Sequence, residues 1–142
     1  MAITQAMCTS FKVELMKAVH NLTNGANTIR IALYTSSATM GAATTAYSTT
    51  NEISGTGYTA KGGALTNVTP VASGTTALAD FADFTFGSST LTANGALIFN
   101  DTASGDPGIV VLAFGADKSS SSGDFTIQFP AASSSAAIIR IA

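Results

Sequence analysis

The sequence predicts one mainly β domain over residues 1–142, a β-sandwich or jelly-roll-like barrel of about seven or eight strands with one N-terminal amphipathic α-helix. Two observations lead to this prediction. Up to position 24 the apolar residues recur at helical spacing, whereas short runs that alternate between apolar and polar residues follow from position 26. Connectors rich in Gly, Ser and Asn separate those runs. We therefore expect a helix over residues 1–24 and a sandwich over residues 26–142.

Residues 1–24 favour a helix because their apolar side chains fall on one stripe. The stripe contains Ile3, Met7, Phe11, Leu15, Ala18 and Leu22. Thr4 is the expected N-cap, because its hydroxyl can accept a hydrogen bond from a free backbone N–H. Asn24 and Gly25 tolerate the left-handed conformation that commonly follows a helix. We expect the stripe to pack against an edge or an end of the sandwich.

Several later segments have the patterns of strands. Residues 29–34 alternate in a way that predicts one buried face, and apolar side chains also stand at every second position in residues 84–86 and 125–129. Residues 96–99 and 109–114 are continuous apolar runs, which are typical of strands buried on both faces. These runs predict the core of the sandwich.

Residues 36–61 show no strong periodicity and are rich in Thr, Ser and Ala. We expect a long ordered loop with about one turn of helix, and such loops usually have a function or contact a partner. Disorder is the alternative, although low charge and two tyrosines argue against a solvated tail.

Composition narrows the classes of partner. Charged residues make up 10% of the chain, and the formal net charge is −2. The basic residues are scattered singly, whereas nucleic-acid phosphates and anionic lipid headgroups require clustered cations. No apolar run has the length of a membrane-spanning helix, and the start of the chain lacks the features of a secretory signal. We expect an unprocessed, soluble protein with no nucleic-acid or membrane partner, whose low charge suits assembly with other subunits.

The sequence shows no catalytic or cofactor-binding constellation. The one histidine, His20, lies near the expected helix C-terminus, where the helix dipole favours a positive or polar group. The one cysteine, Cys8, would lie about 18 Å from it along a helix, too far for the hydrogen bond that activates a thiol. Nucleophile-elbow, phosphate-loop and zinc-helix motifs are missing. We expect a protein that is not an enzyme and holds no cofactor.

Aspartates are the remaining candidates for chemistry. Asp80 and Asp83 are near neighbours, and four more lie in or beside expected turns. Those four are Asp101, Asp106, Asp117 and Asp124. A structural role is the main interpretation, because Asp commonly bonds to the local backbone of turns. We expect no metal, since the alternating spacing of a calcium loop is missing. A glycosidase pair of Asp80 and Asp83 would lack the usual aromatic platform, because the chain has no Trp.

Five residues are candidates for contact with a partner protein. Tyr34, Tyr47 and Tyr58 are candidates for exposed contacts, because tyrosine is enriched in interfaces where one end of the side chain is dry and the other wet. Val13 and Met16 project away from the helix stripe. They are either isolated apolar surface residues, which are common, or part of a second contact surface.

An apolar run at residues 138–142 predicts a terminal strand. Left exposed, such a strand would promote aggregation, so it must be covered. The sheet of the same domain can cover it, or it pairs by strand addition with a neighbouring subunit or a lattice. Ile139 and Ile141 are therefore interface candidates.

Four segments resemble small proteins encoded among the virion structural genes of tailed bacteriophages. They are residues 1–12 (MAITQAMCTSFK), 31–39 (IALYTSSAT), 57–60 (GYTA) and 137–142 (AIIRIA). The resemblance covers most of the chain and implies a virion protein made in the cytoplasm of the bacterial host. In size and expected sandwich, the chain is similar to the capsid cement or decoration proteins of short-tailed phages.

The resemblance implies that this chain bridges and stabilises the lattice of the major capsid protein. Weak contacts repeated over many copies retain such a protein on its shell. We expect a homo-oligomer, a dimer or a trimer, that contacts the major capsid protein or other virion proteins through residues 36–61 or the N-terminal helix. One alternative is a tail- or fibre-associated receptor-binding module. A second is a small hydrolase that acts on envelope polysaccharide.

Overall fold

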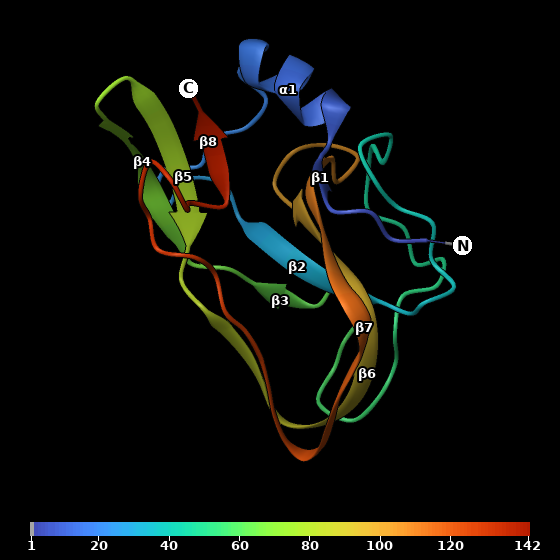
Figure 1. Cartoon of the computed structure of the whole chain (residues 1–142). Helices are drawn as coiled ribbons and strands as arrows, with labels where there is room; N and C mark the ends of the chain where they lie inside the picture. Colours follow the sequence, from blue (N-terminus) through green and yellow to red (C-terminus); the bar gives the residue numbers. More distant parts are fainter. Residues whose placement is uncertain (1) are drawn as a thin grey trace.

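The computed structural model describes residues 2–142, which form two antiparallel β-sheets and one short helix (Figure 1). The larger sheet has the strand order β1-β7-β6-β2-β3, and the smaller has the order β4-β5-β8. The elements are β1 (Ala6–Met7), α1 (Thr9–Met16), β2 (Ile29–Tyr34), β3 (Gly63–Ala64), β4 (Asn67–Ser73), β5 (Thr76–Phe81), β6 (Phe84–Asn100), β7 (Gly108–Ile127) and β8 (Ile139–Ile141). The predicted fold class, mainly β and sandwich-like with a single helix near the N-terminus, is confirmed.

Two long strands and β2 supply most of the core. Residues 96–99 of β6 and 109–112 of β7 are buried, as their continuous apolar runs predict. β2 is buried on both faces, although its alternating pattern predicts one. The difference arises because the following loop folds back over β2, where Ile53 N–H donates to Leu33 O and the Tyr58 hydroxyl accepts the Leu33 N–H. In that loop, Ser48 O accepts a hydrogen bond from the Tyr34 hydroxyl at 2.6 Å.

β6 and β7 form one long, bent hairpin that reaches the lower end of the molecule in Figure 1. Their register runs from the Phe84–Ile127 pair to the Phe99–Gly108 pair and shifts at several points. Left-handed residues accompany the shifts, among them Gly115 with a φ of 80°. Three hydroxyl pairs join the strands at 2.8–2.9 Å: Thr85–Thr126, Ser89–Ser120 and Thr92–Ser119. Part of the Ser and Thr content therefore serves cross-strand pairing.

The N-terminal helix is shorter than predicted. It has 8 residues, so the helix expected over residues 1–24 is wrong outside α1. Cys8 occupies the N-cap position in place of Thr4, whose N–H instead donates to Met40 O at 2.9 Å. Ala18 adopts a left-handed φ of 58° just beyond the helix end. Among residues 2–142, no helix has the length and apolarity needed to cross a membrane.

Tertiary contacts explain why the first residues are extended. The edge of β7 provides backbone partners for β1, which an isolated segment would lack. The Ile3 side chain also lies against Gly95, where an added Cβ would come within 2.8 Å of two Ile3 carbons. Ile3 thus packs against the core from an extended segment, whereas Phe11 does so from α1.

Residues 36–61 form a long ordered loop, as predicted, but without the expected turn of helix. Backbone hydrogen bonds attach this loop to the long hairpin. The N–H of Tyr47 donates to Asp106 O, that of Gly108 to Thr45 O, and that of Thr90 to Thr56 O. Gly57, with a φ of 83°, allows a close approach, because an added Cβ would lie 2.9 Å from Ser89 Cβ. The loop therefore covers the outer edge of β6 near Thr90.

Candidate functional site

The loop of residues 36–61 is attached to the larger sheet through a half-buried carboxylate, Glu52. The Tyr47 hydroxyl donates to Glu52 Oε2 and the Tyr58 hydroxyl to Oε1, each at 2.6 Å. The backbone N–H of Lys61 donates to Oε1 at 2.8 Å. Tyr34 pairs with Glu52 through an isolated β-bridge. We call these residues the Glu52 network, and they include all three tyrosines nominated from the sequence.

Lys61 extends the Glu52 network to the turn between β6 and β7. Its Nζ lies 2.8 Å from both Asp101 Oδ1 and Asp106 Oδ2. The same Nζ lies 5.7 Å from the centroid of the Tyr47 ring, which stacks on Phe99 with centroids 4.8 Å apart. Hydrogen bonds to the two carboxylates raise the pKa of Lys61. These turn aspartates therefore have a structural partner.

The tyrosine hydroxyls are already bonded within the chain. Tyr34 is 2% exposed, so the expectation of an exposed contact residue fails there. Tyr47 and Tyr58 are half-buried. Burial raises the pKa of Tyr34, and burial together with the hydrogen bond to Glu52 raises the pKa of Tyr47 to about 12 and also raises that of Tyr58. In the isolated chain, the tyrosines attach the loop to the sheet.

A different region gathers the exposed apolar surface. Among the described residues, the exposed large hydrophobic side chains are Val13, Met16, Val19, Val68, Val71 and Ile141. They belong to α1 and the segment after it, to β4 and to β8, which lie at the upper end of the molecule in Figure 1. A groove of about 270 Å³ separates these elements and is lined by Leu15, Pro70 and Ile139, among others. We call this region the apolar end, since contiguous apolar surface commonly marks a contact site.

Four residues nominated from the sequence lie at the apolar end. Met16 is 83% exposed, Val13 is 45% exposed and Ile141 is 53% exposed. Ile139 is buried, and its side chain lines the groove together with Ile141. The structure therefore brings candidates from opposite ends of the sequence to the same end of the molecule.

The charged side chains near the apolar end are mostly cations. Lys12, Lys17 and Arg140 form no salt bridge with any residue in the described range 2–142. Arg140 donates one hydrogen bond to Ser134 O at 3.3 Å. Glu14, the acidic residue of α1, is bonded to His20 Nε2 at 3.1 Å. The electrostatics of this end therefore favour a partner that brings carboxylates.

The two edges of the smaller sheet differ. On β4, Thr69 Oγ1 accepts the backbone N–H of Asn24, and Asn67 O accepts the Asn24 side-chain amide. Pro70 in the same strand has no N–H to donate. β8 pairs with β5 on one side, and no backbone hydrogen bond joins its other side to the described part of the chain. The domain thus covers one edge of its terminal strand and leaves the other open.

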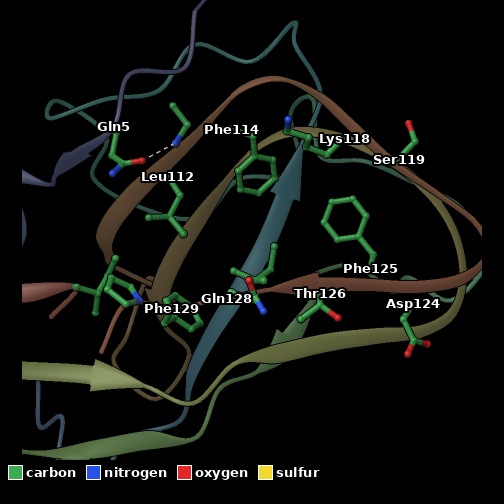
Figure 2. Close-up of a pocket in the computed structure, with 14 residues that line it drawn as sticks. Gln5, Leu112, Phe114, Lys118, Ser119, Asp124, Phe125, Thr126, Gln128 and Phe129 are labelled. Carbon is green, nitrogen blue, oxygen red and sulfur yellow. Dashed lines mark hydrogen bonds between the residues drawn. The ribbon is translucent and has the colours of Figure 1, made fainter. Parts of the chain in front are cut away.

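A second hollow lies inside the bend of β7 and has a volume of about 540 Å³ (Figure 2). Its apolar lining consists of Leu112, Phe114, Phe125, Ile127, Phe129 and Ile138. Lys118, Asp124 and Gln128 are exposed at its rim. The Phe114 and Phe125 rings lie 6.4 Å apart between centroids. We call this hollow the aromatic groove.

His20 is a buried link between α1 and the long hairpin rather than a group at a helix end. Its Nε2 lies 3.1 Å from Glu14 Oε1, and its Nδ1 lies 3.1 Å from Asn100 Nδ2. Asn100 Oδ1 accepts the N–H groups of Thr102 and Ala103, which orients the amide nitrogen toward the ring. Nδ1 must therefore accept and Nε2–H must donate, a tautomer assigned from the hydrogen-bond network.

Cys8 and Asp80 are buried. Burial, with a contribution from Glu14, raises the pKa of the Cys8 thiol to about 11, which suppresses the reactive thiolate. Asp80 Oδ1 accepts the Phe81 N–H at 2.8 Å, while Oδ2 has no hydrogen-bond partner among the described residues. Burial raises the pKa of Asp80. In the described part of the chain, no cluster of three or more His, Cys, Asp or Glu side chains is arranged to hold a metal ion.

Sequence reasoning missed Glu52 and the aromatic groove. The available signal for Glu52 was its position as the one acidic residue in a long segment with little charge. The aromatic groove had no local signal, because the Phe residues on strand runs, such as residues 125–129, were assigned to the core. Only the bend of β7 brings residues 112–114 close to residues 125–129.

Comparison with protein-family models, with curated proteins and with solved structures finds no match. The resemblance to virion proteins therefore stays a prediction. The surfaces described above are the structural basis for a functional proposal.

Proposed function

We propose that this chain is a non-enzymatic structural protein of a bacteriophage virion, and that it is a capsid cement or decoration protein that stabilises the lattice of the major capsid protein. The apolar end is the observation that carries the proposal. Val13 and Met16 are exposed there on α1, and Ile141 is exposed on β8, the strand with an open edge. Such a surface is unfavourable in water and becomes favourable when a partner covers it.

The rest of the fold suits a passive subunit. Hydrogen bonds and ion pairs of the Glu52 network attach the long loop to the sheet, so the domain can present a rigid surface. A rigid subunit loses little conformational entropy on docking. Many copies on one lattice would then convert modest individual contacts into stable retention.

The test is the stoichiometry of the chain in intact particles of the phage that encodes it. Quantitative mass spectrometry should find on the order of hundreds of copies per particle, in proportion to the major capsid protein. Particles that lack the chain should break at a lower temperature than complete particles. Absence of the chain from purified particles would contradict the proposal.

A tail- or fibre-associated receptor-binding module is the second candidate, and the aromatic groove favours it. An aromatic floor with amide and charged groups at its rim is an arrangement that can orient a ligand. This candidate predicts on the order of tens of copies per particle, located on the tail. Loss of adsorption to host cells in a Phe114→Ala variant, with unchanged copy number, would favour it over the cement role.

A further inference from the structure

We infer that the outer edge of β8 binds an extended segment of a partner protein as a fourth strand of the smaller sheet, and that this segment has alternating apolar side chains and carboxylates. The inference rests on the proposed function, because it names the contact by which this chain would attach to another virion protein. It depends on three observations: the open edge, the groove beside it and the unpaired Arg140 side chain within the strand.

The outer edge of β8 is unpaired in the described part of the chain. Alternate residues of an antiparallel strand direct their N–H and C=O groups away from the paired neighbour. β8 pairs with β5 through Ile139, Arg140 and Ile141, and its outward groups have no hydrogen-bond partner among residues 2–142. The opposite edge of the sheet is protected by Asn24 and Pro70. Strand addition to this sheet is therefore directed to β8.

The groove accounts for the apolar side chains of the incoming segment. Strand addition uses backbone hydrogen bonds for affinity and pockets for alternate side chains for specificity. Ile139 and Ile141 line the groove of about 270 Å³, and the segment after α1 forms its opposite wall through Leu22. Side chains at alternate positions of an added strand would lie on the same face as the two isoleucines.

Arg140 accounts for the charge of the segment. It alternates with the two isoleucines that line the groove, so its side chain lies on the opposite face of the sheet, where the carboxylates of an added strand would also lie. Arg140 forms no ion pair with described residues. A second copy is a poor occupant, because a two-fold β8–β8 pairing centred on Arg140 would place two arginines opposite each other. A segment that carries Asp or Glu avoids this repulsion.

The test uses the full chain and a fluorescent synthetic nine-residue peptide in which Val alternates with Glu. Two comparison peptides replace every Glu by Lys or methylate alternate backbone nitrogens. At low salt we expect the Glu peptide to bind about tenfold or more tightly than the Lys peptide. The methylated peptide should not bind, because it cannot donate the strand hydrogen bonds. Binding is measured by anisotropy, and its location by amide NMR shifts of residues 139–141.

Two variants form a matched pair. Ile141 and Val71 are 53% and 54% exposed and lie in the two edge strands of one sheet. Ile141→Lys should weaken binding of the Glu peptide at least about tenfold, whereas Val71→Lys should bind as the unchanged chain does. Circular dichroism of both variants verifies that they are folded.

Three outcomes would overturn the inference. Equal binding of the Glu and methylated peptides would exclude strand addition, and equal loss in both variants would exclude the β8 edge. A dimer in sedimentation equilibrium that Ile141→Lys dissociates would show that a second copy occupies this edge. Absence of peptide binding by a chain that is abundant in particles would contradict this inference alone and leave the cement role intact. Peptide binding by a chain that is absent from particles would contradict the cement role and leave the strand-addition inference intact.

Discussion

The Glu52 network and the apolar end belong to the same sandwich. They differ in whether their charged groups have partners within the chain and whether their apolar side chains are covered. In the network, Lys61 bonds to Asp101 and Asp106, and Glu52 accepts three hydrogen bonds from within the chain. At the apolar end, three cations have no ion-pair partner, and exposed large hydrophobic side chains lie on α1, on the segment after it, on β4 and on the open-edged strand β8.

This difference separates internal stability from contact with a partner. Groups that bond to one another inside the chain raise its free energy of unfolding, and they are unavailable to another protein. Groups left open contribute little to folding, and they can contribute to binding. The comparison therefore predicts large stability effects in the Glu52 network and small ones among the exposed residues of the apolar end.

The largest effect tests whether the apolar end is itself firmly folded. Phe11 anchors α1, since its side chain is fully buried and its ring lies 4.9 Å from that of His20. Phe11→Ala should lower the free energy of unfolding by about 3–5 kcal/mol in urea titrations, because it leaves a cavity. A loss below about 0.5 kcal/mol would show that α1 is peripheral to the folded domain.

Breaking the Glu52 network should have the next largest effect. Glu52→Ala removes the acceptor of the Tyr47 and Tyr58 hydroxyls and of the Lys61 N–H. We expect the free energy of unfolding to fall by about 2–4 kcal/mol. Glu52→Gln serves as the control, because its amide oxygen keeps one acceptor and should retain part of the stability. Equal losses in both variants would mean that the charge, rather than the hydrogen bonds, matters.

Alkaline pH should weaken the Glu52 network selectively. Tyr34, Tyr47 and Tyr58 have folded pKa values above the unfolded value of 10.0, so the unfolded chain loses these protons first. The contribution of the tyrosines is then fully present below pH 10 and falls as the pH rises, by up to about 1.4 kcal/mol per pH unit for each tyrosine that titrates. Cys8 acts in the same direction from pH 9, because its pKa is raised from 9.0 to about 11. Lys61 acts in the same direction, because its pKa is raised above 10.5 and its stabilisation is lost as the pH rises through the folded value.

Urea titrations between about pH 8 and pH 11 measure this dependence. Tyr58→Phe should flatten the curve, because it removes one of the titrating groups. If the free energy of unfolding of this variant falls with pH as steeply as that of the unchanged chain, groups other than Tyr58 cause the loss of stability at alkaline pH.

The smallest effect is expected at the apolar end. Met16 is 83% exposed, so Met16→Ser should change the free energy of unfolding by less than about 0.5 kcal/mol. If the proposed function holds, the same variant should dissociate from particles more readily than the unchanged chain. A loss of stability above about 1 kcal/mol would instead show that Met16 packs within the fold.

The sequence predicted the strands better than the helix. The strand patterns depend mainly on the residues of the run itself, whereas the outcome of the helical stripe depended on contacts with distant segments. Runs such as residues 96–99 and 109–112 are apolar at every position, so burial on both faces is their favourable state whatever their neighbours. The stripe from Ile3 to Leu22 had an alternative outcome, because Ile3 could pack over Gly95 and β1 could pair with β7. A helical period does not exclude an extended segment when a sheet edge is available.

The candidate contact residues were predicted in part. Met16 and Ile141 are exposed, but the sequence did not reveal that they share one end of the molecule. Tyr34 has a partner, Ser48, that no periodicity identifies. Hydrogen bonds between a loop and a strand depend on where the loop lies relative to that strand in the folded chain. Patterns of a few residues in a single sequence do not contain this information.

The amino-acid sequence by itself determined the mainly β class, the core strands and the low charge, because these follow from local composition and from periods of a few residues. The tertiary structure decided which strand edges are covered, which tyrosines are bonded internally and where β7 bends to form the aromatic groove. Each of these depends on segments far apart in the sequence coming into contact, and the open edge of β8 exists only because nothing else in the described chain pairs with it.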